Sequence, residues 1–551
     1  MTPNTATEQK NIRKTVVLKA NDPADIAEAG RLLREGQLVA IPTETVYGLA
    51  ANALDEQAVL HIFEAKGRPQ DNPLIVHISS MEQLPALVRE IPPLVYTMAE
   101  HFWPGPLTMV MKKADCIPLR TSAGLDTVGI RMPSHPAARA IIDAAGVPLA
   151  APSANTSGRP SPTNARDTLD DMDGKIPAIV DGGASSVGVE STVVDMTHGY
   201  PQILRPGAIT EEMIAAAVGS ASTDEAVLHG LAEGEKPKAP GMKYRHYAPK
   251  APVLLFEGSP DATAKAILET PRESFDAILC FEEYLPEMKK KQSRLVYSLG
   301  CSWDHAEHSR RLFTLLRHFD HTGARRILAQ CPRTCGANAG TVNRIRKSAG
   351  FRCTDCRGGR KVIGVTGRTG SGKSVLSELL RQNGALILDA DAIYKELTEQ
   401  DALMLRELSD RFPGTVKDGR LDRKAMAALV FSDKAALADL NAITHRRVKA
   451  VTEERMAASS AKLVLLDVPI LFGSELDRLC DVTLAILTPR EVSLRRILAR
   501  DGVTEQEALA RLNAQPDDDF YRAHADVLLQ NGGTLADYQA AVQTFFEKYC
   551  K

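Results

Sequence analysis

A glycine-rich segment near the middle of the chain has the residue types and spacing of a phosphate-binding loop. Residues 367–374 read GRTGSGKS, which fits the pattern G-x-x-x-x-G-K-[ST]. Glycines let backbone N–H groups turn toward phosphate oxygens, and a following helix adds its positive N-terminus. The lysine brings a charge to the β- and γ-phosphates, and the serine can ligate Mg²⁺. The spacing therefore predicts an ATP site made by Gly367, Thr369, Gly370, Ser371, Gly372, Lys373 and Ser374.

Three aspartates follow predicted strands beyond this loop. The segment GALILDADAIY predicts a strand that ends in Asp389 and Asp391, two residues apart and so on one face. A carboxylate at that end of a parallel strand can take a proton from an attacking hydroxyl. Asp389 could instead be only the N-cap of a helix. Asp467 ends the strand of KLVLLDVPILF and resembles the acid that lies near Mg²⁺ in P-loop enzymes.

An arginine-rich helix completes the pattern of a small-molecule kinase. Residues 493–515 read SLRRILARDGVTEQEALARLNAQ and are predicted to be helical. Their arginines could close over a triphosphate, or they could merely face solvent. The pattern alone predicts phosphoryl transfer to a small molecule and does not identify the acceptor.

The N-terminal part of the chain has no phosphate loop, but polar residues gather where its predicted strands end. Guanidinium and ammonium groups suit phosphate and carboxylate oxygens, and the candidates are Lys66, Arg68, Arg131 and Arg205. Ser153, Asn155 and Ser161 could add neutral hydrogen bonds. Each residue alone could equally be a surface or turn residue, so the pattern leaves an anion site as one of two alternatives.

The elements that must position these residues alternate between strand and helix, which predicts an α/β fold throughout. Shifts in composition divide the chain into a disordered lead (1–14), a first domain (15–232), a linker (233–250), a small domain (251–350), a second linker (351–361) and a kinase domain (362–551). The linker 233–250 is rich in Pro, Gly and Lys, yet its KYRHY sequence is unusual for a passive spacer.

Composition excludes several classes of protein. The 551 residues carry a net charge of −2, and no stretch approaches the apolar length of a membrane span. The N-terminus lacks the apolar core of a secretory signal, so we expect a cytoplasmic protein. Nine cysteines are too sparse for a secreted disulfide framework.

Two cysteine pairs have a spacing that could bind a metal. Cys331 and Cys335, with Cys353 and Cys356, could supply four thiolates to a structural Zn²⁺. The alternative is reduced, unpaired thiols, which are usual in the cytosol.

The C-terminal unit resembles the dephospho-CoA kinase family. TGRTGSGKS, ILDADAI, DVPILF and ADVLLQNGGT carry the likeness, in the family's order. The resemblance implies transfer of the ATP γ-phosphate to the 3′-hydroxyl of dephospho-CoA, with Mg²⁺, with Lys373 as a catalytic charge and with Asp391 as general base. Two departures, Arg446 where the family often has Pro and Gly473 where it usually has Glu, put local substrate contacts in doubt.

The first 350 residues resemble the threonylcarbamoyl-AMP synthase family, with its YrdC-like domain and a small Rossmann-like C-terminal domain. IPTETVYGL, KGRPQDNPLIVHI, APSANTSGRPSPT and PGMKYRHYAP carry this likeness. It implies that L-threonine, bicarbonate and ATP form threonylcarbamoyl-adenylate and pyrophosphate, for the machinery that modifies adenosine 37 of tRNA. Lys66 and Arg68 would be catalytic through their charge, with Mg²⁺ assisting pyrophosphate departure, and the linker would close over the nucleotide.

The same resemblance assigns the substrate contacts. By the family pattern, ATP would be held by Lys66, Arg68, Asn72, Thr127, Ser153, Asn155, Ser161 and Arg205, and threonine with its carbamate by Thr45, His77, Arg131 and Ser191. The small domain would brace the linker without catalysis.

Taken together, the two halves predict a bifunctional enzyme. Two alternatives stay open: that one half is inactive and serves as a scaffold, or that the first unit is an RNA-binding module. The first unit lacks interleaved aromatic residues and a dense basic stripe, so we do not expect strong direct binding of nucleic acid.

Overall fold

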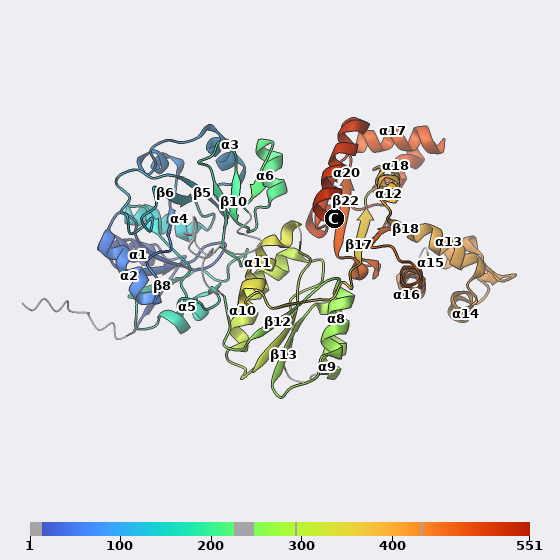
Figure 1. The fold of residues 1–551 in the computed structure, drawn as a ribbon, viewed down its shortest axis with the longest axis horizontal. Coiled ribbons are helices and arrows are strands. Elements are labelled where there is room, and N and C mark those ends of the chain that lie inside the picture. Colours follow the sequence, from blue (N-terminus) through green and yellow to red (C-terminus); the bar gives the residue numbers. More distant parts are fainter. Residues whose placement is uncertain (1–13, 225–246, 292–294, 335, 431–432, 551) are drawn as a thin grey trace, which may run out of the picture.

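The structure, a computed structural model, describes residues 14–224, 247–291, 295–334, 336–430 and 433–550. Three sheets of 11, five and five strands succeed one another along the chain, and each is flanked by helices (Figure 1). The predicted α/β class is confirmed. The lead 1–14 and the linker 233–250 fall largely outside the described residues, so their predicted roles are not tested. None of the described helices is long and apolar enough to cross a bilayer.

The N-terminal sheet has the strand order β1-β8-β2-β3-β7-β4-β6-β5-β9-β10-β11. Its strands are β1 (Val16–Lys19), β2 (Val39–Ile41), β3 (Gly48–Asn52), β4 (Ile75–His77), β5 (Leu107–Lys112), β6 (Thr127–Arg131), β7 (Leu149–Ala150), β8 (Ala178–Asp181), β9 (Thr192–Asp195), β10 (Gln202–Arg205) and β11 (Ser222–Thr223). Its helices are α1 (Pro23–Arg34), α2 (Glu56–Lys66), α3 (Pro93–Phe102), α4 (Pro136–Ala145), α5 (Ala165–Met172) and α6 (Glu211–Val218), with a 3₁₀ turn η1 (Met81–Ala86).

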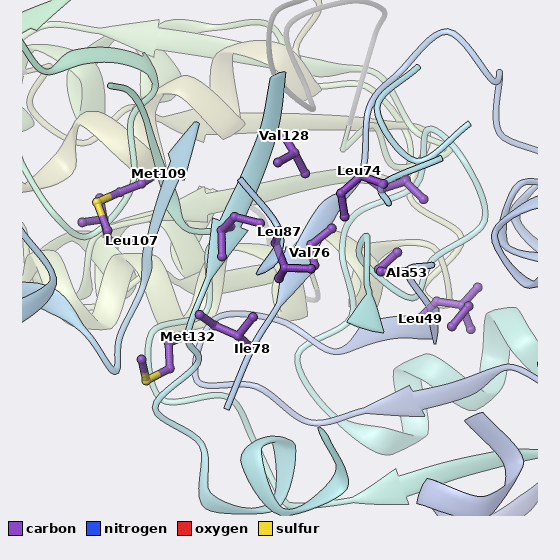
Figure 2. Close-up of a cluster of buried hydrophobic side chains, with 14 of the residues drawn as sticks. Leu49, Ala53, Leu74, Val76, Ile78, Leu87, Leu107, Met109, Val128 and Met132 are labelled. Carbon is purple, nitrogen blue, oxygen red and sulfur yellow. The ribbon is translucent and has the colours of Figure 1, made fainter. Parts of the chain in front are cut away.

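A buried apolar cluster holds this sheet together. Figure 2 shows side chains of β3, β4, β5 and β6 in this cluster, among them Leu49, Val76, Met109 and Val128. Burial of apolar surface is the main stabilising force here, at about 25 cal/mol per Å². The packed sheet fixes the strand ends, where the polar residues singled out above begin.

Helix α2 shows how local sequence places two of those residues. Asp55 caps its start by accepting hydrogen bonds from the N–H groups of Gln57 and Ala58, at 2.9 and 3.3 Å. Gly67 ends it in the left-handed conformation, with φ of 60°. This stop turns Lys66 and Arg68 toward the same cavity.

The middle sheet is parallel, with the order β14-β13-β15-β12-β16. Its strands are β12 (Val253–Glu257), β13 (Asp276–Cys280), β14 (Val296–Ser298), β15 (Arg326–Gln330) and β16 (Cys353–Asp355). Its helices are α8 (Pro260–Glu269), α9 (Leu285–Lys291), α10 (His305–Phe319) and α11 (Ala339–Ser348), with 3₁₀ turns η2 (Glu282–Tyr284) and η3 (Gly336–Asn338). The segment 351–361, expected to be a linker, contributes edge strand β16 to this sheet.

The C-terminal sheet is also parallel, with the order β18-β21-β17-β22-β23. Its strands are β17 (Lys361–Thr366), β18 (Leu386–Asp389), β21 (Leu463–Asp467), β22 (Val482–Leu487) and β23 (Val527–Gln530), and a separate hairpin joins β19 (Val416–Lys417) to β20 (Arg420–Leu421). Its helices are α12 (Lys373–Gln382), α13 (Ala390–Gln400), α14 (Ala402–Arg411), α15 (Arg423–Val430), α16 (Lys434–Ala458), α17 (Arg490–Asp501), α18 (Glu505–Asn513), α19 (Asp518–His524) and α20 (Leu535–Tyr549), with a 3₁₀ turn η4 (Leu476–Leu479).

The middle sheet and its helices, here called the middle unit, lie between the other two (Figure 1). Helix α10 contacts the N-terminal unit, where Arg317 pairs with Asp171 at 3.0 Å. Helix α8 contacts the C-terminal unit, where Lys449 pairs with Asp261 at 2.6 Å. The middle unit is therefore packed against both of its neighbours.

Candidate active sites

The predicted phosphate loop joins β17 to α12 and lines a cavity of about 910 Å³. Six of its predicted residues line that cavity: Thr369, Gly370, Ser371, Gly372, Lys373 and Ser374. Gly367 stands at the strand end, and its carbonyl oxygen accepts a hydrogen bond of 2.9 Å from Lys373 Nζ. Its φ is 148°, and a Cβ there would lie 2.7 Å from the carbonyl oxygen of Ile486, so only glycine fits.

The structure corrects the placement of Asp391. Strand β18 ends at Asp389, and Asp391 lies in the first turn of α13 rather than on the strand. Asp389 is the N-cap, because its Oδ1 accepts from the N–H groups of Asp391 and Ala392 at 2.9 and 3.1 Å. The capping tendency of aspartate therefore ended the strand two residues early. Both carboxylates nevertheless line the cavity together with Asp467.

Charge and burial act together on these groups. Burial raises the pKa of Asp391, Asp389 raises it further, and Lys373 opposes both. Burial also raises the pKa of Asp467, again against Lys373. Burial lowers the pKa of Lys373, while Asp467 and Asp391 raise it. One lysine and three carboxylates thus form a coupled cluster at the carboxyl ends of β18 and β21.

The oxygen donors of this cavity suit Mg²⁺. Ser374 and Asp467 both line it, and hydroxyl and carboxylate oxygens are the ligands that this ion prefers. No group of three or more His, Cys, Asp or Glu residues in the described ranges is arranged to hold a metal by itself. This fits an ion that binds through one or two protein oxygens and substrate phosphates.

The arginine-rich segment forms two helices, α17 and α18, and its arginines reach the cavity. Arg496 donates to the carbonyl oxygen of Gly370 at 3.1 Å and to Asn531 Oδ1 at 3.2 Å. Arg500 lines the cavity but also pairs with Asp501 at 2.6 Å. Arg496 therefore does more than face solvent, while closure of the arginines over a triphosphate stays a prediction.

Three further residues hold the phosphate loop, and sequence reasoning missed them. Asn531 follows β23 directly and donates to the carbonyl oxygen of Ser371 at 2.6 Å. Gln515 accepts from the N–H of Thr369 at 2.9 Å, and Tyr538 lines the cavity from α20. A polar residue at the carboxyl end of a parallel strand was a usable signal for Asn531. No local signal marked Gln515 or Tyr538.

A second cavity lies in the N-terminal unit and is small, about 60 Å³. Most of the residues predicted for ATP and threonine line it: Thr45, Lys66, Arg68, His77, Arg131, Ser153, Asn155, Ser191 and Arg205. Three predicted residues are not in its lining: Asn72, Thr127 and Ser161. Residues from segments more than a hundred positions apart are thus brought to one place.

Two cations, the buried Lys66 and the half-buried Arg68, line this cavity. Lys66 Nζ donates to the backbone carbonyl oxygens of Ser153 and Asn155, the latter at 2.6 Å. Burial lowers the pKa of Lys66 well below its ordinary value, and it lowers that of Arg68 to about 10. An anion that entered the cavity would relieve this cost, because it would compensate both groups in a medium of low dielectric.

The other side holds a buried ion pair and a neutral histidine. Arg131 and Glu44 lie 2.8 Å apart and are 5% and 6% exposed. Burial alone would raise the pKa of Glu44, but Arg131 outweighs it and lowers the pKa. Burial, with Arg131 beside it, lowers the pKa of His77 to about 3, so the imidazole is neutral. Glu44 was not foreseen, although it precedes Thr45 directly in the sequence.

Two more residues line this cavity, one beside the predicted Ser191 and one at the end of the KYRHY sequence. Glu190 lines it just before β9, and Tyr247 lines it from the end of the predicted linker. Burial raises the pKa of Tyr247 to about 12, so its hydroxyl stays protonated. The rest of the KYRHY sequence lies outside the described residues.

The predicted zinc ligands are only partly described. Cys331 is buried, Cys353 is exposed and Cys356 is half-buried, and Cys335 lies outside the described part of the chain. Burial raises the pKa of Cys331 well above its ordinary value, which favours a protonated thiol in the absence of a metal. The four-thiolate site stays a prediction.

Three family models match the chain in separate regions. The model described as "Telomere recombination" (Sua5, YciO and YrdC proteins) matches residues 31–207. The model for the C-terminal domain of threonylcarbamoyl-AMP synthase matches residues 209–350. The dephospho-CoA kinase model matches residues 361–537. The matches therefore divide the chain between its two cavities.

Individual relatives divide it in the same way. A threonylcarbamoyl-AMP synthase of Pyrococcus abyssi is 46% identical over 336 residues, which are 59% of this chain and 94% of the relative. A dephospho-CoA kinase of Deinococcus radiodurans is 45% identical over 176 residues, 31% of this chain and 84% of the relative. The solved structure of P. abyssi Sua5 complexed with L-threonine has a TM-score of 0.55 at 44% identity, and covers 62% of this chain and 99% of that one.

Proposed function

Because the chain belongs to the threonylcarbamoyl-AMP synthase family over residues 31–350 and to the dephospho-CoA kinase family over residues 361–537, we propose that it performs two reactions at two separate sites. The N-terminal site forms threonylcarbamoyl-adenylate and pyrophosphate from L-threonine, bicarbonate and ATP. The C-terminal site transfers the γ-phosphate of ATP to the 3′-hydroxyl of dephospho-CoA. The product of the first reaction serves the tRNA threonylcarbamoylation machinery, and that of the second is coenzyme A.

At the kinase site, Asp391 acts as general base toward the acceptor hydroxyl. Its raised pKa brings the carboxylate closer to the basicity that proton removal needs. Lys373 and the N–H groups of the loop hold the phosphates, and Arg496 fixes the loop through Gly370. Ser374 and Asp467 hold Mg²⁺, which neutralises charge on the β- and γ-phosphates.

At the synthase site, catalysis is by positioning and charge. The carbamate of threonine is an anion that must approach an anionic α-phosphate, so repulsion has to be screened. Lys66, Arg68 and Arg205 supply the screening, since all three line one cavity, where Lys66 and Arg205 are buried and Arg68 is half-buried. Arg131, His77, Thr45 and Ser191 hold the threonine part. The cavity is smaller than a nucleotide needs, so substrate binding must widen it.

The middle unit completes the synthase half, and we place its end after β16 rather than at residue 350. The kinase half then begins with β17. Whether Cys331, Cys335, Cys353 and Cys356 hold a structural Zn²⁺ is decided by the metal content of the purified protein.

One observation carries the proposal: each family's residues line their own cavity, and no described residue lines both. We expect Lys373→Ala to lower coenzyme A formation at least about 100-fold, because the loop loses its charge. Threonine-dependent release of pyrophosphate should stay unchanged. Arg68→Ala should have the converse effect. Both activities are measured on each purified variant, and loss of both from either single change would contradict two independent sites.

A further inference from the structure

Helix α11 of the middle unit sends an arginine into the N-terminal unit. Arg344 is fully buried, and its Nε donates to Glu190 Oε2 at 3.0 Å. Its Nη2 donates to the backbone carbonyl of Glu190 at 3.2 Å, and its Nη1 donates to that of Pro206. One side chain therefore ties together two loops of the other unit, those that precede β9 and follow β10.

The carboxylate that Arg344 binds faces the synthase cavity. Glu190 lines that cavity, and its Oε1 accepts a hydrogen bond of 2.6 Å from Ser161 Oγ. Burial alone would raise the pKa of Glu190, but Arg344 and Arg205 together lower it to about 2. The carboxylate is ionised, and each of its oxygens has a different partner, so its orientation is fixed.

The loop after β10 is the second link. Arg205 lines the cavity and donates to the carbonyl oxygen and the hydroxyl of Ser191, both at 3.1 Å. Gly207, two residues later, packs against Gly340 of α11 so closely that a Cβ on Gly340 would lie 2.9 Å from its Cα. Helix α11 is thus seated on the backbone that carries Arg205, one turn before Arg344.

We propose that Arg344 is a positioning residue of the adenylate-forming site, so that the middle unit forms part of that site rather than only a brace. The argument rests on the proposed synthase function. Arg344 neutralises Glu190 and holds it against Ser161. Without Arg344, Glu190 is a buried anion, and Arg205, Lys66 and Lys347 are cations that remain near it. Glu190 and Arg205 would then draw together, and Arg205 would leave the geometry in which it meets the nucleotide.

A plain docking role is the competing explanation, and the same helix supplies the control. Arg346 pairs with Glu257 through two bonds of 2.7 and 2.9 Å, and Glu257 belongs to the middle unit itself. Arg346→Met removes a bidentate ion pair from α11 without touching the synthase cavity. Arg344→Met removes a comparable pair that reaches it.

The test compares Arg344→Met, Arg344→Lys, Glu190→Gln and Arg346→Met in the full chain. Pyrophosphate release gives kcat and KM for ATP and for threonine, coenzyme A formation by the same chain shows that the kinase half is folded, and the melting temperature reports on the synthase half. We expect Arg344→Met to raise KM for ATP at least about tenfold, with KM for threonine raised less. Arg344→Lys should show a smaller rise in KM for ATP than Arg344→Met. Arg346→Met should keep KM for ATP within about twofold of the parent.

Arg344 and Glu190 act as one unit. The double variant Arg344→Met with Glu190→Gln should therefore raise KM for ATP by less than the product of the two single effects. The inference is overturned if Arg344→Met leaves KM for ATP within about twofold of the parent while lowering only the melting temperature. If Arg344→Met does not fold, the same criterion is applied to Glu190→Gln: a KM for ATP within about twofold of the parent would overturn the inference.

Failure of the proposed function would be recognised separately. A parent chain that releases no pyrophosphate contradicts the synthase assignment. Calorimetric titration of ATP into the Lys373→Ala chain, with and without Arg344→Met, then still shows whether Arg344 affects nucleotide binding, and equal affinities would overturn the inference.

Discussion

At the scale of single residues, the buried pair of Glu44 and Arg131 sets the charge around the proposed threonine position. Both side chains are almost fully buried, and their N···O distance is 2.8 Å. A buried ion pair holds its members in place more than it stabilises the fold, because desolvation offsets most of the attraction. Glu44 therefore keeps Arg131 oriented toward a cavity that must bind an anion.

We expect Glu44→Gln to raise KM for threonine about tenfold, with a smaller change in KM for ATP, because Arg131 loses the charge that orients it. The control is Glu56→Gln, which removes the exposed pair of Glu56 and Arg120 and should change neither constant beyond about twofold. Steady-state assays of pyrophosphate release measure both. An equal rise in the two constants would contradict a specific role at the threonine end.

The pair of Asp389 and Asp391 leads to a prediction about pH. A general base works only when deprotonated, so kinase activity should fall as pH drops through the pKa of Asp391. Asp389 helps to raise that pKa, so removing its charge must lower it. Asp389→Asn keeps the helix cap, since asparagine caps as well as aspartate. We expect the acid limb of kcat/KM for dephospho-CoA to move to lower pH in this variant.

The pH profile of coenzyme A formation, in parent and Asp389→Asn, provides the measurement. Asp410→Asn is a control on another helix, α14, and should leave the acid limb where it is. A limb that moves to higher pH, or does not move, would show that Asp391 does not set it.

Residues grouped in short motifs were predictable from the sequence, and those contributed from a distance were not. The residues of the phosphate loop lie within a few positions of one another, so spacing indicated their chemistry, whereas the ATP role of Lys66 and Arg68 came from the family resemblance. Glu190 and Gln515 meet their partners across 29 and 146 positions. Nothing in the local sequence encodes such meetings, because they depend on how sheets and helices pack.

At the scale of elements, helix caps and helix stops determine where helices and strands end. Gly67 ends α2 with a φ of 60°, a conformation that favours glycine. The prediction that the strand extends to Asp391 was wrong, because Asp389 caps α13 and so ends β18. Strand β16 was missed because its three residues are all exposed and have no alternating pattern. Short edge strands of this kind depend on a neighbour, here β12, rather than on their own sequence.

The close contact between Gly340 of α11 and Gly207 gives a prediction at this scale. Replacing glycine by alanine inside a helix ordinarily stabilises it by about 0.5–1 kcal/mol. At Gly340 the added Cβ would lie 2.9 Å from Gly207 Cα and 3.1 Å from its carbonyl carbon. We therefore expect Gly340→Ala to lower the melting temperature and to raise KM for ATP in the synthase assay. A higher melting temperature would show that the helix can move away at no cost.

At the scale of the whole molecule, part of the contact between the kinase half and the middle unit lies at the end of the kinase sheet opposite the nucleotide site. These contacts come from residues just before β22 and β23, at the amino ends of those strands. Arg333 of the middle unit donates to the carbonyl oxygens of Asp477 and Cys480, at 2.6 and 3.2 Å. A Cβ on Gly336 would overlap the carbonyl oxygen of Asp526. The phosphate loop, at the carboxyl ends, is left facing away from the junction.

Asp526 is the charge at the centre of this junction. It is buried and accepts from the N–H and hydroxyl of Thr483, each at 2.7 Å, and Arg333 Nε lies 3.7 Å away. His305 Nε2 lies 3.5 Å from it, but burial and Arg333 lower the pKa of His305 to about 4. The histidine is therefore neutral at pH 7, and Arg333 is the cation that compensates Asp526. This junction could not be predicted, because its members come from segments that have no common motif.

Arg333→Met would leave Asp526 without its cation, so we expect the free energy that holds the middle and kinase units together to fall by about 3 kcal/mol. Both activities should persist at 25 °C, since neither cavity contains Arg333, while thermal unfolding should begin earlier and separate into two transitions. Adding Asp526→Asn should restore part of the lost stability, because the uncompensated charge is removed.

The control is Lys449→Met, which breaks the more exposed pair with Asp261 and should lower the stability by less than about 1 kcal/mol. Calorimetry of the four chains provides the measurement, and equal losses from Arg333→Met and Lys449→Met would mean that Asp526 does not depend on Arg333. The two halves would then be held together by general packing rather than by one compensated charge.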